Sequence, residues 1–205
     1  MFHRLRAPYR PCVAGDQLNI FPLPPRHAGG RPPSGRGFIP HVRRRAVTHR
    51  HPHHVTLRVR RHVWNLRSQR CFARIAHALR GVRAREAFRI VHFSVLGNHI
   101  HLLAEGEDRG GMTNGVRALA IRIAKRLNKL MGTRGSLFVD RYHERILASP
   151  TTVRNAMRYV LTNHEHHYGA SHRKRDRYSS AWPACADLVS RPASWLLRDG
   201  WTRAP

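Results

Sequence analysis

Acidic residues are scarce in this sequence, and the shortage limits what the chain can bind. Its 205 residues contain 11 Asp and Glu against 38 Lys and Arg, which gives a formal charge of +27. This balance favours a polyanionic partner. Arginine dominates the excess, and its planar guanidinium makes forked contacts with phosphate oxygens. Part of the charge can equally be ordinary solvated surface.

Long apolar runs are absent too. No stretch approaches the roughly 20 apolar residues that a membrane-spanning helix needs, so nucleic acid is favoured over a membrane as the partner. Internal repeats are also lacking. Hydrophobic residues nevertheless make up 41% of the chain, which is enough for a folded domain with its own core.

Cysteine is rare, and its three positions form no pattern. Cys12, Cys71 and Cys185 are odd in number and widely spaced. This spacing suits neither a disulfide framework nor a zinc knuckle. The N-terminus lacks the apolar core of a secretion signal. We therefore expect a cytoplasmic protein, associated with the nucleoid if its partner is DNA.

The composition changes along the chain and suggests three parts. Residues 1–45 are rich in Pro, Gly and Arg, which predicts a disordered basic tail. This tail could touch DNA without sequence preference, or it could be an over-extended gene start without a role. Residues 46–170 carry the regular hydrophobic patterns of one folded domain. Residues 171–205 are polar and then rich in Trp, and we treat them as a C-terminal extension.

Hydrophobic periodicity predicts four strands and three helices in the folded part. Ser68 and Ser149–Pro150 are start signals for the first and last helices, Gly132 is a stop signal, and a break is expected at Gly110–Gly111. In the last helix, the predicted buried residues are Val153, Ala156, Met157, Val160 and Leu161. The predicted strands are 55–60, 88–95, 99–104 and 144–148, and the predicted helices are 69–82, 113–131 and a third from residue 150 onward.

The order of these elements predicts the fold. Strand, helix, strand, strand, helix, strand is satisfied most economically by an α+β, ferredoxin-like sandwich. It would have a four-stranded antiparallel sheet with two helices on one face, and the last helix would be additional. The other face of the sheet would then be available for a functional site.

A pair of histidines is the first candidate for chemistry. His99 and His101 are two apart in a predicted strand, so their side chains point to the same face. Two adjacent imidazoles can bind one divalent metal ion. The chain has 17 His, and two further spaced pairs, 51/53 and 164/166, show that such pairs also arise by chance. The alternative is two half-exposed surface histidines.

A tyrosine and an asparagine form the second candidate. Tyr159 and Asn163 are four apart in the last predicted helix, so they are neighbours on one helix face, beside the apolar stripe. A phenol hydroxyl and an amide oxygen would then project together. The alternative is a tyrosine packed at the rim of the core with its hydroxyl in water.

Three sequence blocks, in this order, carry a family resemblance. Residues 95–103 read Val-Leu-Gly-Asn-His-Ile-His-Leu-Leu, residues 137–145 read Leu-Phe-Val-Asp-Arg-Tyr-His-Glu-Arg, and residues 158–163 read Arg-Tyr-Val-Leu-Thr-Asn. They resemble the signatures of the single-tyrosine HUH transposases, IS200-like enzymes, and in particular the REP-associated tyrosine transposases. Tyr178-Ser-Ser with Trp182 is similar to a late element of that family, in altered order. The resemblance spans about residues 50–185.

The chain departs from the family pattern at two points. His164 follows Asn163 where the family usually has Pro, and Gly97 precedes Asn98 where Pro is usual. Neither change removes a group that would react. They leave open a diverged or domesticated member that binds hairpin DNA or RNA without cleaving it.

The resemblance implies a mechanism and a role for each candidate residue. Residues 46–170 would be an HUH transposase-like catalytic domain that cleaves and rejoins single-stranded or hairpin DNA and contributes to DNA transposition. Tyr159 would be the nucleophile of a 5′-phosphotyrosine intermediate. His99, His101 and Asn163 would hold a divalent metal, Mg²⁺ or Mn²⁺. A homodimer is possible, since the family includes monomers and dimers.

Basic residues on the helix 113–131 are the candidates for phosphate contacts, with one more residue ahead of the last strand. The alternative for the helix is a solvated charged face, and for the last residue a structural role. The set is Arg117, Arg122, Lys125, Arg126, Lys129 and Arg141.

Two rival functions remain open at this point. An RNA-recognition module without catalysis would share the fold but would need stacked aromatics on its central strands. A zinc hydrolase or another metal-dependent nuclease could use the run His164-Glu-His-His. Such an enzyme would use a water nucleophile and would form no covalent DNA adduct.

Overall fold

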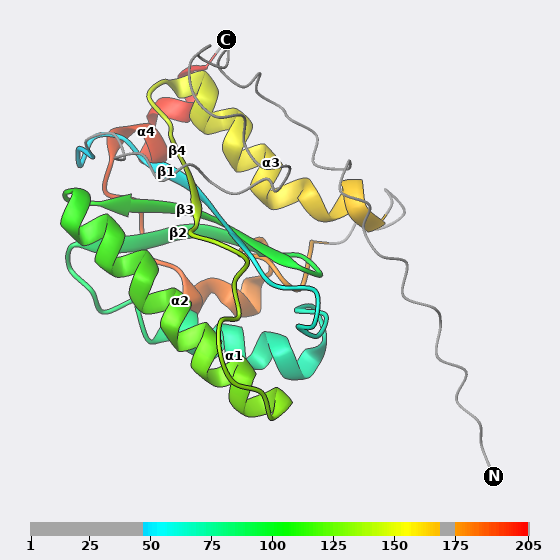
Figure 1. The fold of residues 1–205 in the computed structure, drawn as a ribbon. Coiled ribbons are helices and arrows are strands. Elements are labelled where there is room, and N and C mark those ends of the chain that lie inside the picture. Colours follow the sequence, from blue (N-terminus) through cyan, green and yellow to red (C-terminus); the bar gives the residue numbers. More distant parts are fainter. Residues whose placement is uncertain (1–46, 169–174, 205) are drawn as a thin grey trace, which may run out of the picture. The chain divides into compact units, whose positions relative to one another are not determined.

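The computed structural model describes residues 47–168 and 175–204, all within the unit Phe38–Pro205 (Figure 1). The predicted basic tail, residues 1–45, lies outside the described residues. No helix in the described part of the chain has both the length and the apolar character needed to cross a membrane.

Four antiparallel strands form one sheet, which confirms the predicted ferredoxin-like α+β fold. They are β1 (His53–Arg58), β2 (Phe88–Val95), β3 (His99–Gly106) and β4 (His143–Ile146), in the spatial order β2-β3-β1-β4. The central strands are in register with Thr56 opposite His101. This order follows from two crossed strand–helix–strand units.

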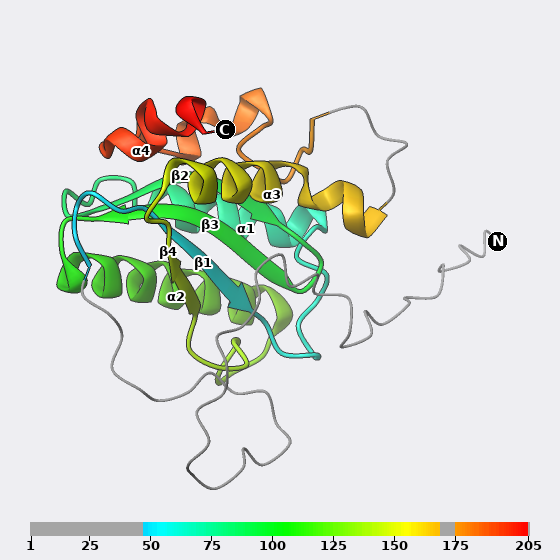
Figure 2. The same cartoon turned by 90° about the horizontal axis from the view of Figure 1, so that it is seen from above.

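Helices cover both faces of the sheet (Figure 2). The helices α1 (Gln69–Arg80) and α2 (Arg109–Met131) lie on one face, and α3 (Pro150–Tyr168) lies on the other (Figure 1). The Ser68 side chain caps α1 by accepting a hydrogen bond from the Cys71 amide, as its sequence position predicts. Gly132 ends α2 in the left-handed conformation.

The start of α2 corrects the sequence prediction. The helix begins at Arg109 rather than at residue 113, so Gly110 and Gly111 lie in its first turn instead of breaking the chain. Asp108 caps it, and its carboxylate accepts from the Gly111 amide at 2.6 Å. A Cβ at Gly111 would lie 2.5 Å from the Ala87 carbonyl oxygen, so glycine is needed here for close packing.

The strand β3 is buried on both sides, and this places the site. Ile100, Leu102 and Ala104 belong to the core beneath α1 and α2, whereas Leu103 belongs to the smaller core beneath α3. Successive strand residues alternate between faces. His99 and His101 therefore share the face of Leu103, which α3 covers.

The buried stripe of α3 differs in part from the prediction. Val153, Ala156 and Val160 are buried as expected, but Met157 and Leu161 are only half-buried. The apolar partners on this face are few, and Val91 and Leu103 are among them, so the helix buries the side centred nearer Ala156. Because the buried side is centred nearer Ala156 than Met157, Asn163 lies on the buried stripe and not beside it.

The C-terminal residues pack against the same unit. Ser179 pairs with Ser94 at the outer edge of β2, and Glu105 of β3 accepts hydrogen bonds from the backbone of Ala193 and from Ser194. Three short helices follow, η1 (Pro183–Leu188), α4 (Trp195–Arg198) and η2 (Gly200–Arg203). Both α4 and η2 contact α3, so this segment helps to hold that helix over the sheet.

A glycine in α2 provides a test of the close packing. We expect Gly115→Ala to lower the free energy of unfolding by about 2–3 kcal/mol, because the added Cβ would overlap the buried Phe88 ring. Urea denaturation measures this change. Gly110→Ala in the same helix is the matched control, since its Cβ would meet only the Asp108 carboxylate at 3.3 Å. Equal stability of the two variants would contradict this packing.

Candidate functional site

The two histidines of the predicted metal pair are buried beneath α3. His99 is 8% and His101 1% exposed, and their ring centroids lie 4.7 Å apart. The alternative of two half-exposed surface residues is therefore wrong. Burying two imidazoles side by side is costly unless their polar atoms have partners, so the partners of each ring nitrogen decide what the pair can do.

One nitrogen of each ring is held by a neighbour. His99 Nδ1 lies 2.7 Å from Asn98 Oδ1, an acceptor, so Nδ1 carries the proton and donates it. His101 Nδ1 lies 3.1 Å from both Thr56 Oγ1 and His54 Nε2 on β1. This arrangement leaves the two Nε2 atoms, and both are buried without a hydrogen-bond partner.

This pattern fits a metal site. A metal-ligating histidine commonly donates its second N–H to a fixed acceptor, which orients the ring and leaves a lone pair on the other nitrogen. His99 meets this description through Asn98, and His101 meets it when Nδ1 donates to Thr56 or His54. The residues present therefore fit a divalent cation bound by two Nε2 atoms.

The imidazoles are also in the right charge state. Burial first, and then the charges of neighbouring basic groups, lower the pKa of His99 and of His54 to about 4. Burial, followed by the neighbouring His99, holds the pKa of His101 well below its ordinary value. All three rings are neutral at pH 7, and the neutral ring is the form that binds a metal.

Tyr159 of α3 lies over this cluster. Its ring centroid is 5.2 Å from that of His101 and 5.7 Å from that of His54. Burial raises the pKa of the phenol above its ordinary value, and the neighbouring Asn163 side chain lowers it in part. The helix thus brings a half-buried phenol to the side of the sheet that carries the histidine pair.

Asn163 lies one helical turn after Tyr159 and is 2% exposed. Its amide nitrogen is buried without a hydrogen-bond partner. The two atoms of an amide exchange places by a half-turn of the side chain, so either can face the cluster. Among residues 47–168 and 175–204, no group of three or more His, Cys, Asp or Glu is arranged to hold a metal. The Asn163 amide remains the third ligand that the sequence predicts.

The predicted phosphate-binding residues lie elsewhere. The helix α2 covers the opposite face of the sheet, so the structure does not bring its basic residues together with the histidine pair. Arg117, Lys125 and Lys129 are exposed, while Arg122 and Arg126 are half-buried.

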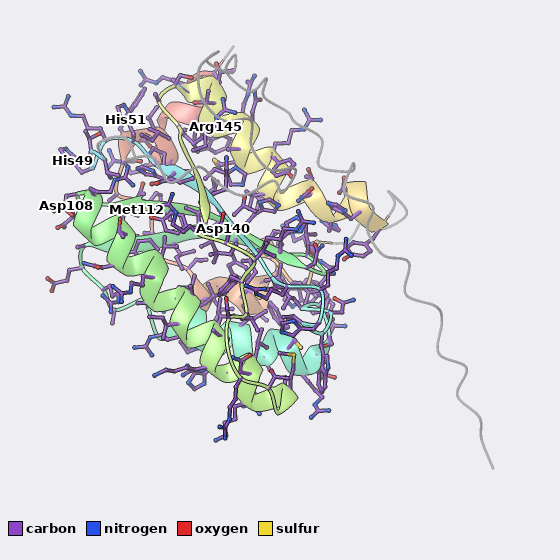
Figure 3. All side chains as sticks on the ribbon, viewed as in Figure 1. His49, His51, Asp108, Met112, Asp140 and Arg145 are labelled. Atoms are coloured by element: carbon purple, nitrogen blue, oxygen red, sulfur yellow. The ribbon has the colours of Figure 1, made fainter. Side chains whose placement is uncertain are left out.

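Two of the predicted phosphate-binding residues share a pocket. Arg117 and the exposed Arg141 line a cavity of about 470 Å³ between α2 and the loop before β4. Phe138 and Tyr142 form part of its wall, and Asp140, labelled in Figure 3, lies in the same loop. The pocket is mostly apolar and separate from the histidine cluster.

Sequence reasoning passed over His54 and Thr56. Their spacing in β1 is the same two-residue spacing that identified His99 and His101, but only the register between β1 and β3 shows that they contact His101. Asn98 lies in the first of the three sequence blocks, and the sequence alone does not indicate its role. The structure gives it one, as the partner of His99.

The histidines proposed for the rival hydrolase, in the run 164–167, have different surroundings in the structure. His164 is buried, and neither of its ring nitrogens has a hydrogen-bond partner. The His167 ring centroid lies 5.8 Å from that of His99. The side chain of His166 lies outside the described residues.

Comparison with solved structures supports the fold. The chain resembles a REP-associated tyrosine transposase bound to a REP hairpin, with a TM-score of 0.53 and 17% identity over 64% of this chain and 76% of that one. It is also similar to a crystal structure from Deinococcus radiodurans R1 that is provisionally assigned as a transposase. That comparison has a TM-score of 0.41 and 17% sequence identity, and it covers 62% of this chain and 93% of the other. No family model matches the sequence, and no curated protein matches it. The resemblance to the REP-associated enzymes is thus confirmed at the level of the fold.

Proposed function

We propose that this protein cleaves and rejoins single-stranded or hairpin DNA through a 5′-phosphotyrosine intermediate formed on Tyr159, and thereby contributes to DNA transposition. One observation carries the proposal: His99 and His101 are buried side by side, each with an Nε2 atom that lacks a hydrogen-bond partner, and the half-buried Tyr159 ring packs against His101. The fold shared with a hairpin-bound transposase adds to it, as does the strongly basic composition.

Different residues would bind the metal that contacts the phosphate and attack the phosphorus. His99, His101 and Asn163 would hold the Mg²⁺ or Mn²⁺ ion, which supplies polarisation of the scissile phosphate. Asn98, Thr56 and His54 would fix the two imidazoles in position. Tyr159 supplies the nucleophilic oxygen, and α3 determines where that oxygen lies.

The covalent step balances without an external energy source. The Tyr159 oxygen bonds to phosphorus and the bond from phosphorus to the 3′ oxygen breaks. The DNA downstream of the break then stays on the enzyme through its 5′ phosphate, and the upstream DNA leaves with a 3′-OH. The phenol loses one proton and the departing 3′ oxygen gains one. Since one phosphodiester replaces another, an incoming 3′-OH can reverse the step and rejoin the DNA.

A single assay tests the function. Purified protein is mixed with labelled single-stranded DNA and Mn²⁺, and the products are separated under denaturing conditions. We expect a covalent protein–DNA species together with a fragment ending in 3′-OH. DNA binding without that species would instead indicate a domesticated hairpin-binding protein.

The partner of His99 allows a finer prediction. We expect Asn98→Ala to weaken Mn²⁺ binding roughly 10- to 100-fold, because His99 Nδ1 loses the acceptor that orients the ring. Calorimetric titration with Mn²⁺ measures the affinity. Asn98→Asp, which keeps an acceptor oxygen, should restore most of it. Asn128→Ala on α2 is the control, and an equal loss in that variant would count against a positioning role for Asn98.

A further inference from the structure

An exposed tryptophan lies in the loop between β1 and α1. Trp64 is 44% exposed and is one of the few large apolar side chains on the described surface. A large aromatic ring in contact with water loses the gain it would have from burial. Single exposed apolar side chains are common on protein surfaces, so the significance of Trp64 depends on the residues that surround it.

The surroundings of Trp64 are strongly basic. The Arg70 guanidinium carbon lies 5.6 Å from the centre of the indole ring. Arg60, Arg61 and His62 in the same loop are exposed. The sequence between Asp16 and Glu86 contains no acidic residue. This combination of an aromatic face with adjacent cations suits a nucleic-acid strand, whose bases stack and whose phosphates are negative.

The loop is attached to the turn that carries Asn98. The Val59 amide donates to the Asn98 carbonyl and the Leu66 amide donates to the Gly97 carbonyl, each at 2.9 Å. Arg58, at the end of β1, lies opposite His99 in the register of β1 and β3. Trp64 thus belongs to a loop that borders the His99 end of the candidate site.

A neighbouring residue holds this loop in place. The Arg67 guanidinium donates to both carboxylate oxygens of Asp176, at 2.8 and 2.7 Å, and to the Val95 carbonyl. It also lies 4.7 Å from the ring centre of Tyr168 and 4.4 Å from that of Tyr178. Arg67 therefore fixes the loop three residues after Trp64 and links it to the end of α3.

A second exposed tryptophan offers a contrast. Trp195 is also 44% exposed and also lies near an arginine, with Arg203 at 5.7 Å. Its ring packs on Gly200, where a Cβ would lie 2.7 Å from it, so it has a structural role. It stands in α4, in the C-terminal segment rather than beside the Asn98 turn. It therefore serves as a matched control.

We propose that Trp64 is a stacking platform for an unpaired base of the single-stranded DNA that flanks the scissile phosphate. Arg60, Arg61 and Arg70 contact the adjacent phosphates. The proposal deepens the function proposed above and rests on it, since it takes the bound strand to be the strand that Tyr159 cleaves. Stacking tolerates any base, so this contact adds affinity without setting the sequence.

The test separates base stacking from charge. Tyr159→Phe protein, which cannot cleave, is titrated with a 12-nucleotide oligothymidylate and with an abasic strand of the same length and charge. We expect this protein to prefer the strand with bases by roughly tenfold. Adding Trp64→Ala should remove the preference and leave binding of the abasic strand nearly unchanged. Adding Trp195→Ala should preserve the preference.

Each contrary result overturns the proposal. Equal binding of the two strands by the Tyr159→Phe protein would show that charge alone holds the DNA, and a preference that survives Trp64→Ala would place stacking elsewhere. Tighter binding of oligouridylate than of oligothymidylate would assign the platform to RNA. These results are separable from the proposed cleavage, because the covalent adduct is scored with the unsubstituted protein.

Discussion

Tyr159→Phe should abolish the covalent protein–DNA adduct, with a loss of at least about 1,000-fold, while the variant folds and binds DNA as the unsubstituted protein does. The substitution removes one oxygen atom and keeps the ring that packs 5.2 Å from His101 and 5.7 Å from His54. Without that oxygen the chain has no nucleophile at this position, and no other group replaces a lost covalent step. Denaturing gel electrophoresis with end-labelled DNA measures the adduct.

The control for this substitution lies on the same helix. Tyr168→Phe changes a phenol that is 45% exposed, and it should retain the adduct. An adduct that persists in Tyr159→Phe but disappears in Tyr168→Phe would show that Tyr168, and not Tyr159, is the nucleophile. Cleavage that continues in Tyr159→Phe without any adduct would favour a water nucleophile. In that case His164→Ala and His166→Ala become the informative variants, as the hydrolase reading requires.

His101→Ala should eliminate the stabilisation that Mn²⁺ gives the protein. A ligand present at about 100 times its dissociation constant raises the free energy of unfolding by about 2.7 kcal/mol. We expect this gain for the unsubstituted protein. We expect almost none for the variant, because one of the two imidazole ligands is gone. Thermal melting with and without Mn²⁺ measures the difference, and adduct formation should fall with it.

The metal-free protein should respond differently to the same substitution. His101 Nε2 is buried without a hydrogen-bond partner, which costs stability in the absence of metal. Removing the ring removes this cost, so we expect His101→Ala to lower the free energy of unfolding by less than the lost packing alone would. His53→Ala is the control, since His53 is fully buried and lies 2.8 Å from Glu144. It should lower stability with and without Mn²⁺ and keep the Mn²⁺ effect. Loss of that effect in His53→Ala, or its survival in His101→Ala, would contradict the assignment of the site.

Local patterns in the sequence predicted most of the fold. The strands and helices follow periods of two and 3.6 residues, and capping residues such as Ser68 and Gly132 mark helix ends. The start of α2 was predicted four residues too late. The reason is tertiary: the glycines that suggested a break fit a helix packed closely against Ala87.

The candidate site could be predicted only in part. The shared face of His99 and His101, and the one-turn spacing of Tyr159 and Asn163, are local properties that a sequence displays. The contacts of His54 and Thr56 with His101 depend on the register between β1 and β3, which local sequence patterns do not reveal. Likewise, the charges of α2 were visible, but the face of the sheet that they cover was not.

The C-terminal segment along β2 has a consequence for how copies of this protein behave when they are crowded. The Val95 amide donates to the Tyr178 carbonyl, and the Ser180 amide donates to the Phe93 carbonyl, so the chain itself occupies hydrogen-bonding groups at that margin. In solution a formal charge of +27 makes copies of the chain repel one another. Phosphates would cancel that repulsion on DNA, and an open strand edge would then invite intermolecular pairing. Along β2, the backbone of residues 178–180 occupies part of the strand edge, so this protection against intermolecular pairing does not depend on charge.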